Sequence, residues 1–127
     1  MLTPGVVHTL SDRVRRLVAP NPGPMTGPGT NTYLIGSGDN VAILDPGPAI
    51  DSHIEAIVDA CAGKASQVVC THTHPDHSPA AAVLAQRLNV PLEPFVICII
   101  FAANCSFATP VGYQTNLLVL GPGRYRF

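Results

Sequence analysis

Residues 67–78 read QVVCTHTHPDHS, and this stretch indicates both a fold class and a chemistry. Its first part, QVVCT, is a short β-prone run, so we expect a strand over residues 67–71. A crowded polar group follows directly: His72, His74, Asp76 and His77. Polar side chains at the end of a strand are typical of an active site or a binding site.

The residue types in this cluster indicate a metal site. Imidazole nitrogens and carboxylate oxygens are donors that suit Zn²⁺, with Fe or Mn as alternatives. On an extended chain His72 and His74 point to the same side, so both can reach one ion. Asp76 and His77 lie beyond the turn at Pro75 and would serve a second ion nearby. The four side chains are enough for two partial metal shells.

Three of the five histidines of the chain lie in this cluster, between an apolar strand and the expected start of a helix. Such crowding is improbable for histidines without a function. The other two, His8 and His53, stand alone, so we interpret them as ordinary core or surface histidines.

Three runs upstream of the cluster predict further strands. Residues 14–18, VRRLV, alternate apolar and basic side chains and stop at Pro20, which predicts a short edge strand. Residues 31–35 and 41–44 are β-prone and are separated by GSGDN, so we expect an antiparallel hairpin. Residues 21–30, NPGPMTGPGT, must form a loop, because proline removes backbone donors and glycine tolerates positive φ.

Two helices are expected among these strands. Asp51 can cap a helix that Gly63 closes. Its apolar positions recur at helical spacing: Ile50, Ile54, Ile57, Val58 and Cys61. Ser78 as N-cap and Pro79 at the first helical position predict a second helix. Its buried stripe is expected at Ala81, Leu84, Ala85 and Leu88. Strands that alternate with helices define an α/β fold.

The composition of the 127 residues predicts a globular chain and gives no strong nucleic-acid signal. With 46% hydrophobic and 12% charged residues, the sequence is too apolar for a disordered chain. The formal net charge of -1 provides no basic field that would hold a polyanion. The four cysteines form no C-x-x-C pair and the N-terminus lacks a signal-peptide pattern. We therefore expect free thiols, no cleaved leader and a cytoplasmic protein.

The character of the sequence changes near Pro91. Residues 94–123 carry no charged side chain. This stretch approaches the length of a membrane-crossing helix, about 20 apolar residues, but Pro110 and Gly112 interrupt it. The segment is expected either as a buried region of strand and loop or as a membrane-associated segment.

The motif THTHPDHS resembles the H-x-H-x-D-H signature of the metallo-β-lactamase superfamily. The similarity extends upstream through VAILDPGP and NPGPMTGPGTNTYLIG, and it covers about residues 12–90. This order of segments is similar to the glyoxalase II and β-lactamase-like protein 2 branch. The resemblance implies a mixed sheet with helices, as in the N-terminal half of an αβ/βα sandwich, truncated and followed by an apolar C-terminal segment.

The resemblance also implies roles for individual residues. The first of two zinc ions would be bound by His72 and His74, and the second by Asp76 and His77. Asp76 would in addition orient the attacking water. Asp45 would lie behind the metals, with the alternative that it is a turn residue capping the next helix. Thr30 and Asn31 would lie on a loop that faces the site and the substrate.

The chain departs from the family after the motif. No histidine follows His77, no aspartate follows Asp76, and Glu93 is the only later carboxylate. Each zinc would therefore have two protein ligands here, whereas catalytic zinc usually has three. We expect an incomplete or weakly active hydrolase, with an apolar sheet face that an oligomer could cover.

Residues 94–127 resemble a stretch near the end of divalent-anion:sodium symporters, through the run SFATPVGYQTN. In that family the run belongs to a broken helix near the substrate and sodium sites. The corresponding residues here would be Ser106, Thr109, Thr115 and Asn116. We therefore expect two parts, an incomplete metallo-β-lactamase-like domain over residues 1–92 and a tail resembling a transporter fragment over residues 93–127.

The main interpretation is a metal-dependent hydrolase that acts on a small-molecule ester, thioester or phosphodiester. In the family, two zinc ions lower the pKa of a water toward ~7 and polarise the scissile bond. Two alternatives stay open. One is a membrane-associated fragment of a symporter-like protein, held through residues 94–123, and the other is a metal-binding module without catalysis.

Overall fold

The computed structural model describes residues 2–90, so the segment 91–127 and residue 1 lie outside this account. The described elements follow one another as β1 (His8–Ser11), β2 (Val14–Val18), β3 (Asn31–Ser37), β4 (Asn40–Leu44), α1 (Asp51–Ala60), β5 (Gln67–Val69) and α2 (Ala81–Arg87). Strands and helices therefore share one α/β unit, as the sequence pattern predicts.

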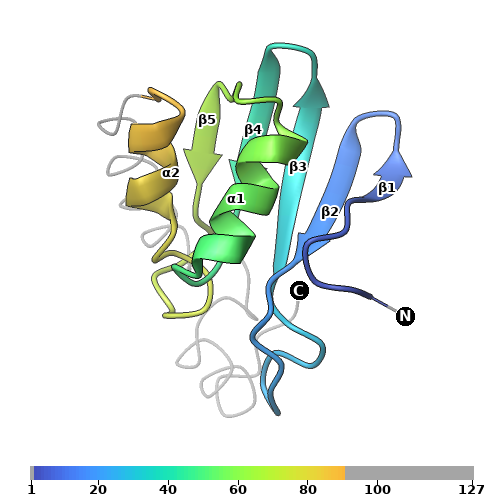
Figure 1. Cartoon of the computed structure of the whole chain (residues 1–127), viewed down its shortest axis with the longest axis vertical. Helices are drawn as coiled ribbons and strands as arrows, with labels where there is room; N and C mark the ends of the chain where they lie inside the picture. The colour runs from blue at the N-terminus through green and yellow to red at the C-terminus, as the bar shows by residue number, and fades with distance from the viewer. Residues whose placement is uncertain (1, 91–127) are drawn as a thin grey trace, which may run out of the picture.

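The five strands form a single mixed sheet in the order β1-β2-β3-β4-β5 (Figure 1). The pairs β1–β2, β2–β3 and β3–β4 are antiparallel, and the pair β4–β5 is parallel. As a consequence β2, β4 and β5 run in the same direction, and their carboxyl ends lie at the same end of the sheet. Segments that follow such strand ends are where α/β proteins bind ligands.

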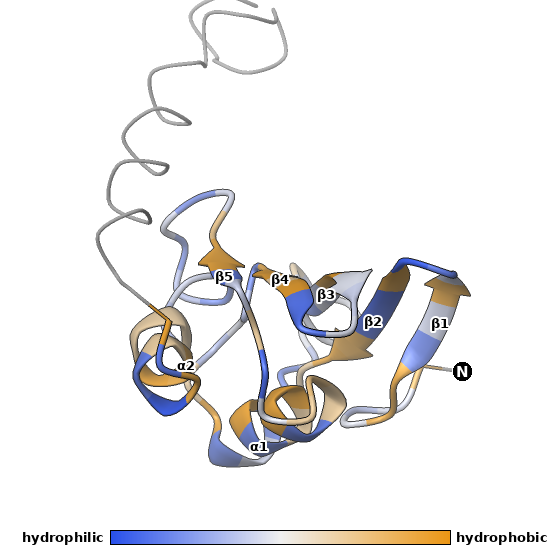
Figure 2. Ribbon diagram, turned by 90° about the horizontal axis from the view of Figure 1, so that it is seen from above, coloured by the Kyte–Doolittle hydropathy of each residue, from blue (hydrophilic) through white to orange (hydrophobic). Residues whose placement is uncertain are grey.

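One face of the sheet forms the core. Leu34 pairs with Ile43, and Ile43 pairs with Val68, so these side chains point to the same side of the sheet. All three are fully buried. Both helices lie on this side of the sheet, and they contribute Ile57 and Leu84 to the same cluster (Figure 2). The core is therefore one layer of helices packed on one layer of strands.

The expected hairpin is confirmed, with Asn31–Ser37 paired to Asn40–Leu44. The expectation that Val14–Val18 is an edge strand is wrong, because His8–Ser11 pairs along its outer side and forms the edge. This edge strand is short and mostly exposed, so it lacks the buried alternation that marks strands in a sequence. The last expected strand is shorter than predicted and ends at Val69.

The helix starts differ from the predicted ones. Ile50, not Asp51, is the N-cap residue of α1, and no side chain caps this end. Helix α2 begins at Ala81 after the N-cap Ala80, so Ser78 and Pro79 lie in the turn before it. Gly63 takes part in closing α1 as expected, since its N–H donates to the Val58 carbonyl at 3.0 Å.

None of the helices within residues 2–90 has the length and apolar character needed to cross a membrane. The predicted sodium-site residues Ser106, Thr109, Thr115 and Asn116 lie outside the described residues. The predicted boundary near residue 92 lies outside them as well.

Candidate metal centre

Three segments come together at the end of the sheet where the carboxyl ends of β2, β4 and β5 lie. They are the loop of residues 19–30, the turn of residues 45–50 and the segment 70–80 that carries the histidine cluster (Figure 1). The Gly47 N–H donates to the His77 carbonyl at 2.8 Å, and the Ala80 N–H donates to the Gly47 carbonyl at 3.1 Å. Backbone hydrogen bonds thus connect the turn after β4 to the histidine segment.

Asp45 is the side chain on which this arrangement depends. The residue is 8% exposed, and its carboxylate accepts hydrogen bonds from the Thr71 backbone N–H at 2.7 Å and from the Thr71 hydroxyl at 2.8 Å. Its backbone has a φ of 49°, a conformation that is uncommon outside glycine and is often found at functional positions. The carboxylate faces Thr71 and not α1, whose N-cap has no side-chain hydrogen bond.

The Thr71 hydroxyl determines which nitrogen of His72 carries a proton. This hydroxyl has one proton, and a carboxylate can only accept, so the proton points to Asp45. The Thr71 Oγ1 atom also lies 2.8 Å from His72 Nδ1, so Nδ1 must donate its N–H to that oxygen. The lone pair of His72 is then on Nε2, so this nitrogen is free to bind a metal ion.

His77 lies between two carboxylates. Its Nδ1 is 3.1 Å from Asp45 Oδ2, and its Nε2 is 3.4 Å from Asp76 Oδ2. The Nδ1 atom is buried but not aligned for a hydrogen bond, so within residues 2–90 it has no hydrogen-bond partner. This buried Nδ1 atom would gain a hydrogen bond if the His77 ring rotated slightly toward Asp45, and it would gain a ligand bond if a cation bound to it.

The three imidazole rings lie close to each other. The ring of His72 is 4.6 Å from that of His74 and 4.3 Å from that of His77, measured between centroids. His72 and His74 are exposed, while His77 is partly covered. In residues 2–90 no group of three or more His, Cys, Asp or Glu side chains is arranged to hold a metal ion. The donors meet in pairs, and the Asp76–His77 pair is the closest to a ligand arrangement.

These residues fit a zinc ion by three observations. The donor set consists of imidazoles and a carboxylate, which zinc accepts. The 3.4 Å between His77 Nε2 and Asp76 Oδ2 agrees with the ~3.3 Å that separates two ligands with bonds of ~2.0 Å at a tetrahedral angle. Thr71 leaves the Nε2 lone pair of His72 free, as derived from its hydrogen bonds. The fit covers part of a coordination shell.

The loop before β3 reaches the cluster through Thr30. Its hydroxyl lies 3.3 Å from Asp76 Oδ2, and the residue is 4% exposed. Asn21 holds Thr30 from both sides, since its Oδ1 accepts the Thr30 N–H at 2.9 Å and its Nδ2 donates to the Thr30 hydroxyl at 3.0 Å. The loop therefore presents a fixed hydroxyl to Asp76 and is not a free flap at this position.

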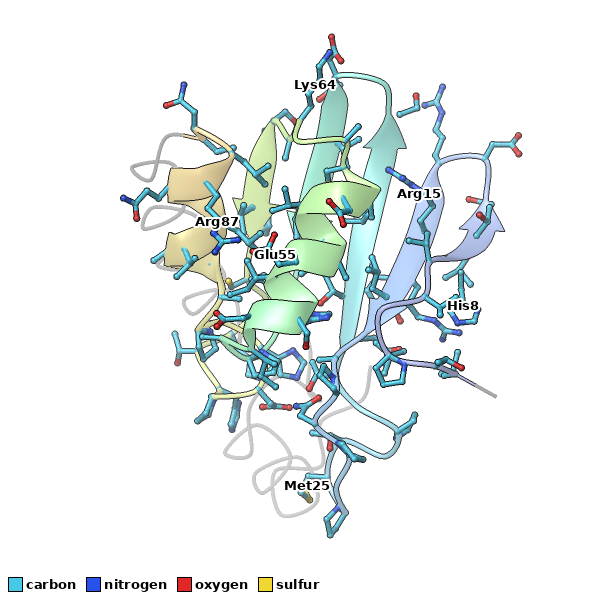
Figure 3. All side chains as sticks on the ribbon, viewed as in Figure 1. His8, Arg15, Met25, Glu55, Lys64 and Arg87 are labelled. Atoms are coloured by element: carbon cyan, nitrogen blue, oxygen red, sulfur yellow. The ribbon has the colours of Figure 1, made fainter. Side chains whose placement is uncertain are left out.

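A cavity of about 290 Å³ adjoins these residues. Its lining combines the loop, the strand β3 and the cluster: Met25, Thr26, Gly29, Thr30, Asn31, Tyr33, Asp45, Asp76 and His77. Met25 is 96% exposed and lies at the end of the molecule opposite Lys64 (Figure 3). The Asn31 Oδ1 atom is buried, with no hydrogen-bond partner in the part of the chain that the structure describes. The cavity thus offers both polar and apolar contacts beside Asp76.

Two cysteines of the described residues, Cys61 and Cys70, are free and buried, which agrees with the expected thiols. Burial, together with the nearby charge of Asp45, raises the pKa of Cys70 to about 11. Cys70 is therefore a protonated thiol at neutral pH in the metal-free chain. The expected Cys98 and Cys105 thiols lie outside the described residues.

Sequence reasoning missed two residues that organise the site. The sequence predicts Thr71 only as the end of a strand, yet Thr71 connects Asp45 to His72. It predicts Asn21 only as part of a loop, yet Asn21 fixes Thr30. Thr71 directly precedes the first histidine, so its position was a usable signal. Asn21 gave none, because its partner is nine residues away in an irregular segment.

Residues 25–96 match the profile of the metallo-beta-lactamase superfamily. This match covers more than half of the sequence, and the chain therefore belongs to the metallo-beta-lactamase superfamily. A solved structure, a beta-lactamase domain protein from Burkholderia ambifaria, is similar with a TM-score of 0.55 and 27% identity. The similarity covers 67% of this chain and 29% of that one. The mixed sheet with two helices is thus part of a metallo-β-lactamase fold.

Two relatives are similar in sequence to parts of the chain. A beta-lactamase-like protein 2 homolog of Caenorhabditis elegans is 41% identical over 75 residues, which are 56% of this chain and 25% of the relative. An uncharacterized transporter of Synechocystis is 49% identical over 49 residues, which are 39% of this chain and 8% of the relative. The chain therefore spans about a quarter of the length of the first relative. The second similarity is in line with a resemblance to membrane transporters, and its 49 aligned residues exceed the 34 residues of 94–127.

Proposed function

We propose that the chain carries part of a zinc-dependent hydrolase site, in which His72 and His74 contribute to one ion and Asp76 and His77 to a second. Membership of the superfamily supports hydrolytic chemistry. The observation that carries the residue assignment is the pair His77 and Asp76, whose donor atoms lie 3.4 Å apart at the mouth of a cavity.

When bound, zinc lowers the pKa of a water molecule to about 7 and polarises the oxygen of the scissile bond. The chain's own residues supply orientation. Asp45 holds Thr71, and Thr71 in turn fixes the His72 ring with its Nε2 lone pair free. Thr30 donates to Asp76 Oδ2, the oxygen that also faces His77 Nε2, and so orients the carboxylate; the second oxygen, Oδ1, remains for a water proton.

We propose a small ester, thioester or phosphodiester as the substrate class. The cavity beside Asp76 combines Tyr33 and Met25 with the polar side chains of Thr30 and Asn31. Such a lining suits a ligand with an apolar part and a polar reacting group. With two protein ligands for each ion, we expect weak zinc binding and slow turnover.

The decisive measurement is the zinc content of the full chain by elemental analysis after equilibration with zinc and removal of the excess. We expect bound zinc in the unmodified protein and a clear loss in His74→Ala and His77→Ala. His8→Ala is the matched control, because His8 lies in β1 and not in the cluster. Zinc that is unchanged in both cluster variants would contradict the proposal.

Catalysis is tested separately from binding. Hydrolysis of a thioester and of a phosphodiester is measured with added zinc, and turnover lost in His72→Ala and Asp76→Asn supports the hydrolase. Zinc binding without turnover on either substrate would instead favour a metal-binding module without catalysis.

We further propose that the chain is divided near residue 92 and that residues 93–127 form a separate, transporter-related segment. The 49% identity over 49 residues to the Synechocystis transporter supports a transporter-related segment, and it does not fix where that segment begins. Flotation of the full chain with neutral lipid vesicles tests the membrane-associated alternative. A chain that stays with the vesicles supports it, and a chain that remains in the aqueous fraction contradicts it.

A further inference from the structure

A chain of buried polar contacts lies directly behind Asp45. The Thr32 hydroxyl donates to the Asp45 carbonyl at 2.8 Å, and the Thr32 Oγ1 atom also lies 2.9 Å from His53 Nε2. Thr32 is fully buried, and His53 is 1% exposed. The three residues belong to β3, α1 and the turn after β4, so the contacts connect three separate elements.

The proton positions in this chain follow from the donor count. The single proton of the Thr32 hydroxyl is used toward the Asp45 carbonyl, which can only accept. The contact with His53 therefore requires an N–H on Nε2, and Nδ1 carries the lone pair. Burial lowers the pKa of His53 to about 4, so the ring is neutral at pH 7 and this single arrangement is populated.

The backbone around these contacts leaves little freedom. Asp45 has a φ of 49°, and Gly47 has a φ of 84°. A Cβ atom on Gly47 would lie 3.2 Å from His53 Nε2, so the turn passes close to the ring. The Gly47 N–H also donates to the His77 carbonyl. Any shift of the turn would therefore move both the Asp45 carboxylate and the backbone of His77.

We propose that Thr32 and His53 are positioning residues for the metal centre, because they fix the Asp45 turn that orients His72 and His77. This inference rests on the proposed zinc site and adds to it two buried residues that do not contact the ion. His53 is thus more than the ordinary core histidine expected from the sequence. Direct hydrogen-bond partners of metal ligands typically affect metal affinity 10- to 100-fold, and Thr32 and His53 act one step further away, through Asp45, so we expect an effect at the lower end of this range.

The test compares isosteric variants of Thr32 in the full chain. Thr32→Val keeps the shape and removes the hydroxyl, while Thr32→Ser keeps the hydroxyl. Zinc affinity is measured well below the unfolding temperature by competition with a chelating dye. We expect Thr32→Val to weaken zinc binding about tenfold and Thr32→Ser to stay within about threefold of the unmodified protein. His53→Gln can keep the N–H toward Thr32 and should resemble Thr32→Ser, whereas His53→Leu should resemble Thr32→Val.

A core variant separates positioning from general loss of stability. Val41 is buried at the other end of β4 from Asp45, so Val41→Ala should lower the unfolding temperature and leave zinc affinity unchanged. Equal zinc affinity in Thr32→Val and the unmodified protein would overturn the inference. A loss in Val41→Ala as large as that in Thr32→Val would overturn it as well.

A second readout does not depend on zinc. The Thr71 N–H donates to Asp45 Oδ1, so its hydrogen exchange reports whether the carboxylate is held in place. We expect exchange at Thr71 to be at least about tenfold faster in Thr32→Val than in Thr32→Ser, and unchanged exchange would refute the inference. If the unmodified chain binds no zinc, the proposed function fails, and this exchange measurement alone decides whether Thr32 and His53 position the turn.

Discussion

His53 makes the stability of the fold depend on pH in a way that can be measured. The ring is buried between α1 and β3, and this burial lowers its pKa from 6.5 to about 4. Between these two values the unfolded chain binds a proton that the folded chain excludes. The free energy of unfolding should therefore be unaffected by His53 above about pH 6.5 and should fall as the pH is lowered toward about 4.

The size of the effect follows from the two pKa values. Each pKa unit corresponds to about 1.4 kcal/mol, and at about pH 5 some 1.5 units of the difference are expressed. The folded state should thus lose about 2 kcal/mol between about pH 8 and about pH 5 through this one ring. A domain of this size has a total stability of about 5–15 kcal/mol, so the loss is large enough to resolve.

Urea unfolding of the chelator-treated chain at both pH values provides the measurement. His53→Gln is the control, because glutamine can keep the hydrogen bond to Thr32 but does not titrate. The other four histidines are present in both proteins, so the difference between the two pH dependences belongs to His53. Identical pH dependences in the unmodified protein and His53→Gln would refute the reasoning from burial.

Two pairs of substitutions test the backbone in the same way. Gly47→Ala places a Cβ atom 3.2 Å from His53 Nε2 at a φ of 84°, so it should lower the free energy of unfolding by more than about 2 kcal/mol. Gly38 has a φ of 58° and open space around it, so Gly38→Ala should lower the free energy of unfolding by about 1 kcal/mol. Ala62→Gly should raise the free energy of unfolding by up to about 1 kcal/mol, because exposed Ala62 has a φ of 50°, and Gly63→Ala at a φ of 69° should lower it similarly. Equal costs within the first pair would contradict the close approach of the Gly47 turn to His53, and no gain from Ala62→Gly would contradict a strained backbone at Ala62.

The sequence predicts the fold where the local pattern and the tertiary structure agree. The hairpin of β3 and β4 has alternating buried residues and a glycine, Gly38, in its turn, so its existence follows from the pattern. The helix starts were mispredicted because Asp51 and Ser78 are good capping residues that the chain does not use. In both cases the position of the preceding turn decides where the helix begins.

The histidine cluster could be predicted because its members are neighbours in the chain. The contacts that orient it could not, since Asp45 is 26 residues from Thr71 and Thr32 is 21 residues from His53. Such contacts depend on which strands lie side by side, and β5 reaches β4 only after the α1 crossover. A lone histidine on a helix gives no sign that its partner is a threonine in the middle of a strand.

The parallel pairing of β4 and β5 explains why the cluster and its support occur together. It places the end of β4, with Asp45, beside the end of β5, where Thr71 begins the histidine segment. The Asp45 carboxylate can then accept hydrogen bonds from both the backbone N–H and the hydroxyl of Thr71. The Thr32 hydroxyl donates to the backbone carbonyl of Asp45. Hydrogen bonds of the fold itself therefore orient His72 and Asp76, so an ion that binds them has less chain to order. On this reasoning the support should survive in variants that lose zinc, and Thr71 exchange in His74→Ala should equal that of the unmodified chain.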